Sequence, residues 1–275
     1  MAAEYSPSSS PRPDTFPSLD GVEDILCYNF KNKSLLEEAF THVSWPWSCE
    51  VSNYERLEYV GDSVLNLMIT KEQFFLYPDL PPGDLTSLRA ANVDKEKLAR
   101  VAVRHGLEKY LRHNKPQYKE HIENFVEEIS RYPLHSNGLV DTPKVLSDIV
   151  ESVIGAVFID SNSCLDTVWK VFRVLLEPII SPETLGSHPV KQFFELCQKR
   201  GWKPEFVDLW EKSMRYNVFI EGQLVGCAVY GRKKEIAYTR AAKDALDYVL
   251  DILGEKEDNE KDELHQDHEL TASEQ

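Results

Sequence analysis

The spacing of apolar residues predicts helices from about residue 20 to residue 180. Apolar side chains recur there every three or four positions, which places them on one face of a helix. One such set is Val168, Phe172, Leu175 and Leu176. Between residues 113 and 143, three prolines and an Asn-Gly pair interrupt the period and predict a loop around one short helix, Ile122–Ile129. We therefore expect this part of the chain to be all-α.

After residue 180 the pattern changes. A segment rich in proline, glycine and serine precedes a helical period over Val190–Arg200. Three short runs rich in β-branched and aromatic residues follow, at Glu205–Trp210, Tyr216–Glu221 and Val225–Tyr230. A final helical period extends from about Lys234 to Leu253, with small alanines on one face. The order α-β-β-β-α predicts a small α+β domain.

These patterns divide the chain into five predicted parts. Residues 1–19 are rich in serine and proline, a composition that predicts a disordered arm. The helical domain at 20–180 is followed by a linker at 181–189 and by the α+β domain at 190–253. Residues 254–275 are crowded with acidic side chains and predict a disordered tail. No apolar run approaches the roughly 20 residues that a membrane-spanning helix requires, so a membrane is not an expected partner.

The charge balance is unfavourable for a partner that carries phosphates. The chain has 46 acidic and 31 basic residues, which give a net charge of −15. Residues 187–254 have a small basic excess, whereas the regions on either side of them are acidic. Attraction of a nucleic acid would therefore depend on local basic patches and on bound cations, and it would fall steeply with added salt.

The cysteine content indicates a reducing compartment. The five cysteines are scattered without the Cys-x-x-Cys spacing of a zinc site, and an odd, unpatterned set does not suggest a disulfide framework. The N-terminal arm also lacks the apolar core of a secretory signal. We expect an intracellular protein, in the nucleus, the cytoplasm or both.

Two groups of carboxylates carry the strongest chemical signal in the chain. The sequences ERLEYVGDSVL at residues 55–65 and DIVESVIGA at residues 148–156 place acids on one face of a predicted helix. These acids are Glu55, Glu58, Asp62, Asp148 and Glu151. Paired acids on a helix usually form a hydrated polar face, but apolar residues surround both groups. In such surroundings carboxylates repel one another unless a cation neutralises them.

Two acidic helices that face each other would supply four oxygen ligands. Such ligands are those that Mg2+ prefers, and metal-assisted hydrolysis of phosphodiesters uses them. Gly61 fits this arrangement, because a glycine inside a helix costs about 1 kcal/mol relative to alanine and so predicts a close approach of another backbone.

Both acidic sequences resemble those of the ribonuclease III family. ERLEYVGDSVL is similar to the family's signature, and DIVESVIGAVFID is similar to its second acidic helix. The similarity extends to Val22–Ser44 and Leu85–Leu107, so it covers roughly residues 20–180. The domain order and the segment Tyr132–Asp148 resemble the small plant ribonuclease III-like proteins most. The resemblance implies an all-α ribonuclease III-type fold for this domain.

The resemblance also implies roles for individual residues. The implied catalytic ligands of Mg2+, or of Mn2+ in its place, are Glu58, Asp62, Asp148 and Glu151. Glu55 and Arg56 would be structural residues at a dimer contact. Lys144 occupies a position where eukaryotic members carry a lysine beside the catalytic site, and an ordinary surface lysine is an equally good interpretation.

The C-terminal α-β-β-β-α order resembles a double-stranded RNA-binding domain. Such domains recognise the shape of A-form RNA, and lysines at the start of the second helix contact phosphates. The positions that match RNA-contacting residues are Lys191, Glu195, Lys233 and Lys234. The loop between the first two strands lacks the usual Gly-Pro-His element of these domains. A small α/β module for dimerisation or protein contact is the alternative.

The expected function is that of a magnesium-dependent endoribonuclease. Metal-activated water would hydrolyse double-stranded RNA in a homodimer, leaving 5′-phosphates and short 3′ overhangs. The alternative is a non-catalytic RNA-binding or regulatory protein that retains the nuclease fold as a dimer scaffold. The clustered carboxylates favour the enzyme, because a scaffold gains nothing from like charges in apolar surroundings.

Overall fold

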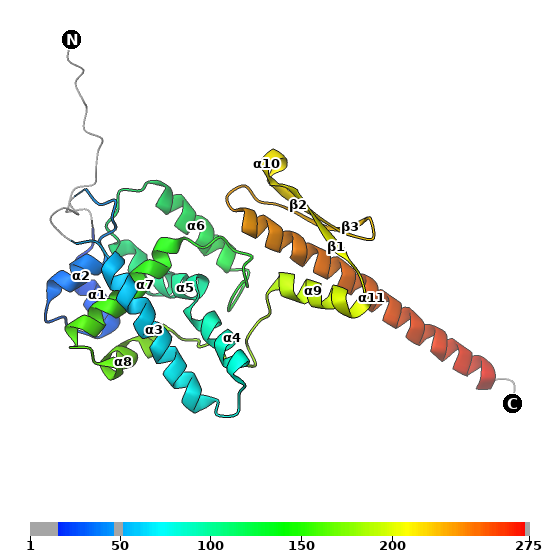
Figure 1. Ribbon diagram of the computed structural model, residues 1–275, viewed down its shortest axis with the longest axis horizontal. Coiled ribbons are helices and arrows are strands. Elements are labelled where there is room, and N and C mark those ends of the chain that lie inside the picture. Colours follow the sequence, from blue (N-terminus) through cyan, green and yellow to red (C-terminus); the bar gives the residue numbers. More distant parts are fainter. Residues whose placement is uncertain (1–15, 47–51, 273–275) are drawn as a thin grey trace, which may run out of the picture. The chain divides into compact units, whose positions relative to one another are not determined.

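The structure of this protein is a computed structural model (Figure 1). It describes residues 16–46 and 52–272, and for residues 255–272 it describes the backbone alone. The expected disordered arm at residues 1–19 therefore lies almost entirely outside the described residues. None of the described helices is long and apolar enough to cross a membrane.

The chain folds into two compact units. The first comprises the residues up to His135 together with Thr142–Leu185. The second comprises Ser136–Asp141 together with the residues from Gly186 onward. The boundary after Leu185 falls within the segment expected to be a linker. The association of Ser136–Asp141 with the second unit differs from the sequence analysis, which assigns this segment to the helical domain.

The first unit is helical, as the apolar period predicts. Its helices are α1 (Asp20–Leu26), α2 (Lys33–Ala39), α3 (Glu55–Leu76), α4 (Pro82–Val93), α5 (Lys95–His105), α6 (Gln117–Ile129), α7 (Lys144–Asp160) and α8 (Leu165–Leu175). A 3-10 helix, η2 (Leu107–Tyr110), follows α5. The predicted short helix Ile122–Ile129 is the second part of α6, which begins directly after Pro116. A proline is tolerated there because the first N–H groups of a helix have no partner within it.

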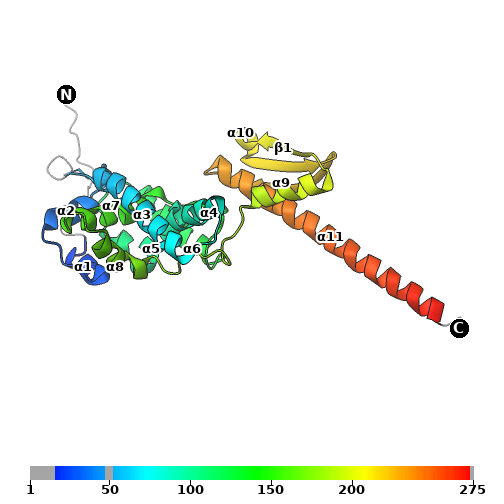
Figure 2. The same cartoon turned by 60° about the horizontal axis from the view of Figure 1, so that its bottom comes forward.

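Two helices of the first unit, α3 and α7, bear predicted site residues, and α7 is the more deeply buried of the two. Its buried apolar side chains are Val145, Leu146, Ile149, Val150, Val153, Ile154 and Val157. It packs against α3 and α5, and both views show α3 and α7 side by side (Figures 1 and 2). A helix that is apolar on nearly every side is expected to lie inside a domain. The acids of α7 are therefore held among packed helices.

Two glycines allow α3 and α7 to cross in close contact. A Cβ atom added at Gly61 of α3 would lie 1.7 Å from the carbonyl oxygen of Glu151. One added at Gly155 of α7 would lie 2.1 Å from the carbonyl oxygen of Leu57. A larger residue at either position would force the helices apart, because nonbonded carbon and oxygen atoms stay about 3.3 Å apart. The close approach that Gly61 predicts is confirmed, and its partner is the second acidic helix.

The second unit has the predicted α-β-β-β-α order, with a one-turn helix in the first loop between strands. Its elements are α9 (Pro189–Arg200), β1 (Pro204–Leu209), α10 (Trp210–Ser213), β2 (Arg215–Ile220), β3 (Gln223–Val229) and α11 (Lys234–Ala272). The strands form an antiparallel sheet in the order β1-β2-β3. The alanines of α11 pack closely on this sheet, since a Cβ added at Gly226 would lie 2.5 Å from the backbone nitrogen of Ala245. The core of the unit contains Phe193, Cys197, Tyr216, Val218, Ile220, Val225, Ala237, Ala241, Ala245, Leu246 and Val249.

Helix α11 continues to Ala272, whereas the sequence analysis predicts a disordered tail from residue 254. The residues after Gly254 include no proline, and they contain six glutamates and two lysines, residue types that have high helix propensity. Leu253 packs against the core of the second unit.

Polar contacts attach Ser136–Asp141 to the second unit. Arg240 Nε donates a hydrogen bond of 2.8 Å to the carbonyl oxygen of Leu139, and the Tyr230 hydroxyl donates one of 3.3 Å to Asp141 Oδ2. Lys233 forms an ion pair with Asp141, whose exposed fraction is 3%. The two hydrogen bonds join positions 101 and 89 residues apart, so no local pattern in the sequence indicates them.

Candidate active site

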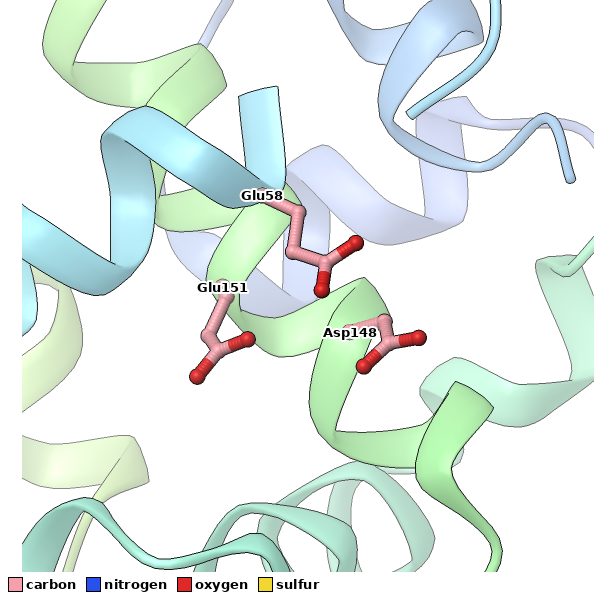
Figure 3. A group of neighbouring side chains, drawn as sticks. All are labelled: Glu58, Asp148 and Glu151. Carbon is pink, nitrogen blue, oxygen red and sulfur yellow. The ribbon is translucent and has the colours of Figure 1, made fainter. Parts of the chain in front are cut away.

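The carboxyl groups of Glu58, Asp148 and Glu151 lie together where α3 meets α7 (Figure 3). Each contributes an oxygen atom, and these atoms lie within 4.8 Å of one another. Figure 3 shows that Glu58 comes from α3 and that Asp148 and Glu151 come from α7. Asp148 is buried, and the other two residues are half-buried. Three carboxylates at this spacing can hold a divalent cation that prefers oxygen ligands.

The Lys144 ammonium lies among these carboxylates. Its Nζ is 2.7 Å from Asp148 Oδ1 and 2.8 Å from Glu58 Oε1. Burial lowers the pKa of Lys144, but its hydrogen bonds to Asp148 and Glu58 outweigh this effect and raise the pKa above its ordinary value. Lys144 is therefore charged, and it offsets part of the negative charge of the cluster.

Glu151 has a strongly raised pKa. Burial, followed by the negative charges of Asp62, Asp148 and Glu58, raises the pKa of Glu151 to about 8. The group is therefore mostly protonated at neutral pH. Repulsion of this kind favours the binding of a cation, and a cation that binds Glu151 must displace its proton.

Tyr54, the residue before α3, contacts the same cluster. Its hydroxyl donates a hydrogen bond of 3.1 Å to Asp148 Oδ2. Burial, and then the negative charge of Asp148, raises the pKa of Tyr54 above its ordinary value, so the hydroxyl keeps the proton that it donates. Tyr54 is not among the site residues predicted from the sequence. Its position next to ERLEYVGDSVL is the signal that could have indicated it.

Comparison with known proteins identifies the family. Residues 55–162 match the Ribonuclease III domain. Ribonuclease 3-like protein 3 of Oryza sativa subsp. japonica is 54% identical over 239 residues, which cover 86% of this chain and 80% of that protein. The chain belongs to the ribonuclease III family. The resemblance of the acidic sequences is thereby confirmed, and the chain is a ribonuclease III-type endoribonuclease.

A longer protein and a solved structure are also similar to this chain, which covers very different shares of the two. Endoribonuclease Dicer homolog 1 of Arabidopsis thaliana is 46% identical over 252 residues, which cover 89% of this chain and 13% of that longer protein. A solved structure of the nuclease domain of ribonuclease III from Campylobacter jejuni is 29% identical, with a TM-score of 0.45. That match covers 59% of this chain and 98% of the solved chain.

Asp62, the fourth predicted ligand in this ribonuclease III domain, lies beside the cluster. It is exposed on α3, and its Oδ1 accepts a hydrogen bond of 2.9 Å from Asn66. The negative charge of Asp62 contributes to the raised pKa of Glu151, which requires that the two carboxyl groups lie near each other. The structure brings three of the four predicted carboxylates together, and the role of Asp62 as a ligand stays a prediction.

Glu55 and Arg56, the residues expected at a dimer contact, lie on the exposed surface of α3. They line part of a surface groove of about 610 Å³. Apolar side chains in this groove are open to solvent, because Tyr59 is 79% exposed and Ile159 is 45% exposed. Exposed apolar surface of this kind often marks a protein contact. The role of the two residues in a dimer stays a prediction.

The residues predicted to contact RNA already have partners within the second unit. Lys233 pairs with Asp141, and Lys234 Nζ lies 2.6 Å from an aspartate of β1. Lys191 and Glu195 are exposed on α9 and form a loose ion pair of 3.9 Å. A phosphate would have to compete with these carboxylates for the ammonium groups. RNA contact by these residues stays a prediction.

Proposed function

We propose that this chain is a magnesium-dependent endoribonuclease that hydrolyses double-stranded RNA. The observation that carries the proposal is the convergence of Glu58, Asp148 and Glu151 in one cluster inside a ribonuclease III domain. Oxygen donors of this kind suit Mg2+, and Mn2+ can take the same place. A non-catalytic RNA-binding protein, the competing interpretation, would not need carboxylates so close together that Glu151 retains a proton near neutral pH.

The chain supplies and orients the ligands of the proposed metal site. Glu58, Asp148 and Glu151 would hold the ion, with Asp62 completing the set. When bound, the metal supplies the activated water and stabilises the departing 3′ oxygen. Glu151 would have to release its proton to serve as a ligand, so rising pH should favour binding of the metal.

Lys144 is placed to act on the substrate. Its ammonium contacts two of the ligand carboxylates, and its side chain is 60% exposed. With these carboxylates engaged as metal ligands, both ion pairs of Lys144 would weaken. The ammonium can then donate hydrogen bonds to a phosphate oxygen of the RNA. The two ion pairs with proposed metal ligands favour a catalytic lysine over an ordinary surface lysine.

Cleavage of both strands of a duplex takes two sites, and residues 55–162 provide one ribonuclease III domain. A symmetric homodimer would supply the second site, because a two-fold contact repeats every residue on the partner. The groove lined by Glu55, Arg56 and Tyr59 is the contact surface that we expect. Staggered cuts by such a dimer would leave 5′-phosphates and short 3′ overhangs.

The second unit would increase the capture of duplex RNA. It has the element order of a double-stranded RNA-binding domain and includes the basic region of the chain. Its predicted contacts, Lys233 and Lys234, would exchange their aspartate partners for phosphates. Deleting residues 187–254 should therefore weaken the apparent affinity for RNA more than it slows the chemical step at saturating RNA.

A duplex-cleavage assay tests the proposed function. The full chain is incubated with long double-stranded RNA and Mg2+, with and without excess EDTA, and the lengths and ends of the products are determined. We expect cleavage that EDTA abolishes and a loss of roughly 1,000-fold in the rate of Asp148→Asn, because that variant removes a proposed metal ligand. Asp79→Asn removes an exposed carboxylate outside the cluster and should cut at the wild-type rate. Binding of RNA by the wild-type chain without cleavage would support the scaffold instead.

A further inference from the structure

The hydrogen bond between Tyr54 and Asp148 holds a side chain on which the proposed metal site depends. Tyr54 lies directly before α3, and Asp148 lies near the start of α7, 94 residues further along the chain. Tyr54 is 5% exposed and Asp148 is 4% exposed, so little water can compete for the bond. Hydrogen bonds to a charged oxygen in such surroundings are among the strong ones in proteins.

The two carboxyl oxygens of Asp148 have different partners. Oδ1 accepts a hydrogen bond of 2.7 Å from Lys144, whose ammonium also contacts Glu58, so Oδ1 faces the cluster. Oδ2 accepts the bond from Tyr54. The carboxyl group therefore cannot rotate without losing a hydrogen bond on each side. Tyr54 thus keeps Oδ1 available to the cluster.

Tyr54 is itself held in place by its surroundings. Its backbone N–H donates to the carbonyl oxygen of Thr41 at 3.0 Å, and its carbonyl oxygen accepts from the N–H of Glu58 at 2.8 Å. The ring of His42 meets its ring edge-on, with centroids 5.7 Å apart. Tyr54 therefore connects the backbone that positions Glu58 to the side chain of Asp148. One residue links the two helices that carry the cluster.

We propose that Tyr54 is a positioning residue for the metal-binding carboxylates, acting through Asp148. This inference rests on the proposed function, because it requires that Asp148 binds the cation. Groups that orient the ligands of a metal typically change its affinity by about 10–100-fold. Loss of the Tyr54 hydroxyl should lie at the lower end of that range, because the burial of Asp148, which is 4% exposed, still restricts its side chain.

Calorimetric titration of the full chain with Mn2+, without RNA, measures the effect. Tyr54→Phe removes the hydroxyl and keeps the ring, and it should weaken Mn2+ binding about tenfold. Tyr28→Phe is the matched control, because the Tyr28 hydroxyl donates a bond of 2.7 Å to Asp160, a carboxylate at the opposite end of α7. Each variant loses one bond from a tyrosine to a carboxylate of the same helix. Tyr28→Phe should bind Mn2+ with wild-type affinity.

A second measurement separates positioning from a general loss of structure. Raising the Mn2+ concentration should restore most of the duplex cleavage that Tyr54→Phe loses, because its defect lies in ion binding. Equal Mn2+ affinity of Tyr54→Phe and the wild-type chain would overturn the role of Tyr54 and leave the proposed function intact. A wild-type chain that binds no Mn2+ would refute the metal site itself. Proteins are usually most stable near about 15 °C. If Tyr54→Phe stays unfolded at that temperature, Tyr54 is required for folding, and the proposal that it positions Asp148 is overturned.

Discussion

Replacing Gly155 with alanine should separate the two helices that carry the carboxylates. The new Cβ would lie 2.1 Å from the carbonyl oxygen of Leu57 and 3.2 Å from the backbone nitrogen of Gly61. A carbon and an oxygen in contact are about 3.3 Å apart, so the helices must move by about 1.2 Å at this point. No side chain can turn aside to make room, because both neighbouring atoms belong to the backbone of α3.

That displacement acts directly on the candidate site. Leu57 precedes Glu58, and Gly155 lies one turn after Glu151, so the shift falls between the ligands of the two helices. A misplacement of about 1 Å can cost about 100-fold in rate. Overpacking of a core typically costs about 1–3 kcal/mol. We expect Gly155→Ala to cleave duplex RNA about 100-fold more slowly and to lose about 2 kcal/mol of unfolding free energy.

Initial rates of duplex cleavage and the midpoints of urea unfolding measure the two effects. Gly83→Ala is the control, because a Cβ added at Gly83 of α4 would meet nothing within 4 Å. It should keep the wild-type rate, and its stability should change by less than the roughly 1 kcal/mol that alanine gains over glycine in a helix interior, because Gly83 lies in the first turn of α4. A Gly155→Ala chain that cuts and unfolds like the wild type would refute the idea that the close crossing of α3 and α7 sets the geometry of the site.

The charges of the site and the apolar surface beside it give three more predictions. In EDTA, thermal melts should show that stability falls as the pH rises from about 5 to about 8. The reason is that the pKa of Glu151 is raised to about 8 in the folded chain, so between about pH 5 and pH 8 the folded chain binds a proton at Glu151 that the unfolded chain has lost. Glu151→Gln should show a weaker dependence of stability on pH. Lys144→Met should bind Mn2+ more tightly in calorimetry and cleave RNA more slowly, because it removes a cation that pairs with Glu58 and Asp148 and the phosphate contact proposed for it; unchanged affinity would argue against competition. Tyr59→Asp should shift the expected dimer to monomer in sedimentation, and a persisting dimer would place the contact on another surface.

Local sequence patterns were sufficient for the helices that carry the site. The apolar period predicts α3 and α7, and the resemblance of their acidic sequences selects four carboxylates, three of which the structure brings together. Gly61 adds a packing constraint, because the cost of a helical glycine is offset only where something needs the space. These features repeat or cluster within about a dozen residues, so a single sequence contains them.

Other features depend on contacts that leave no local trace. The bond from Tyr54 to Asp148 joins positions 94 residues apart through one hydroxyl, and no periodicity accompanies it. The association of Ser136–Asp141 with the second unit likewise rests on a few distant polar partners. The end of α11 shows a different difficulty, because its composition combines the charge of a disordered tail with the helix propensity of glutamate and lysine.

The path of the backbone through Ser136–Asp141 limits how this protein can be dissected. Because that segment belongs with later residues, no single cut yields two whole pieces. A fragment ending at Leu185 would retain the Asp141 carboxylate but lose its partners Lys233 and Tyr230. Asp141 lies only three residues before Lys144, the first residue of α7. A slower step at saturating RNA in such a fragment would reflect a disturbed approach to α7, whereas a weaker apparent affinity would reflect lost RNA capture, so both quantities have to be measured.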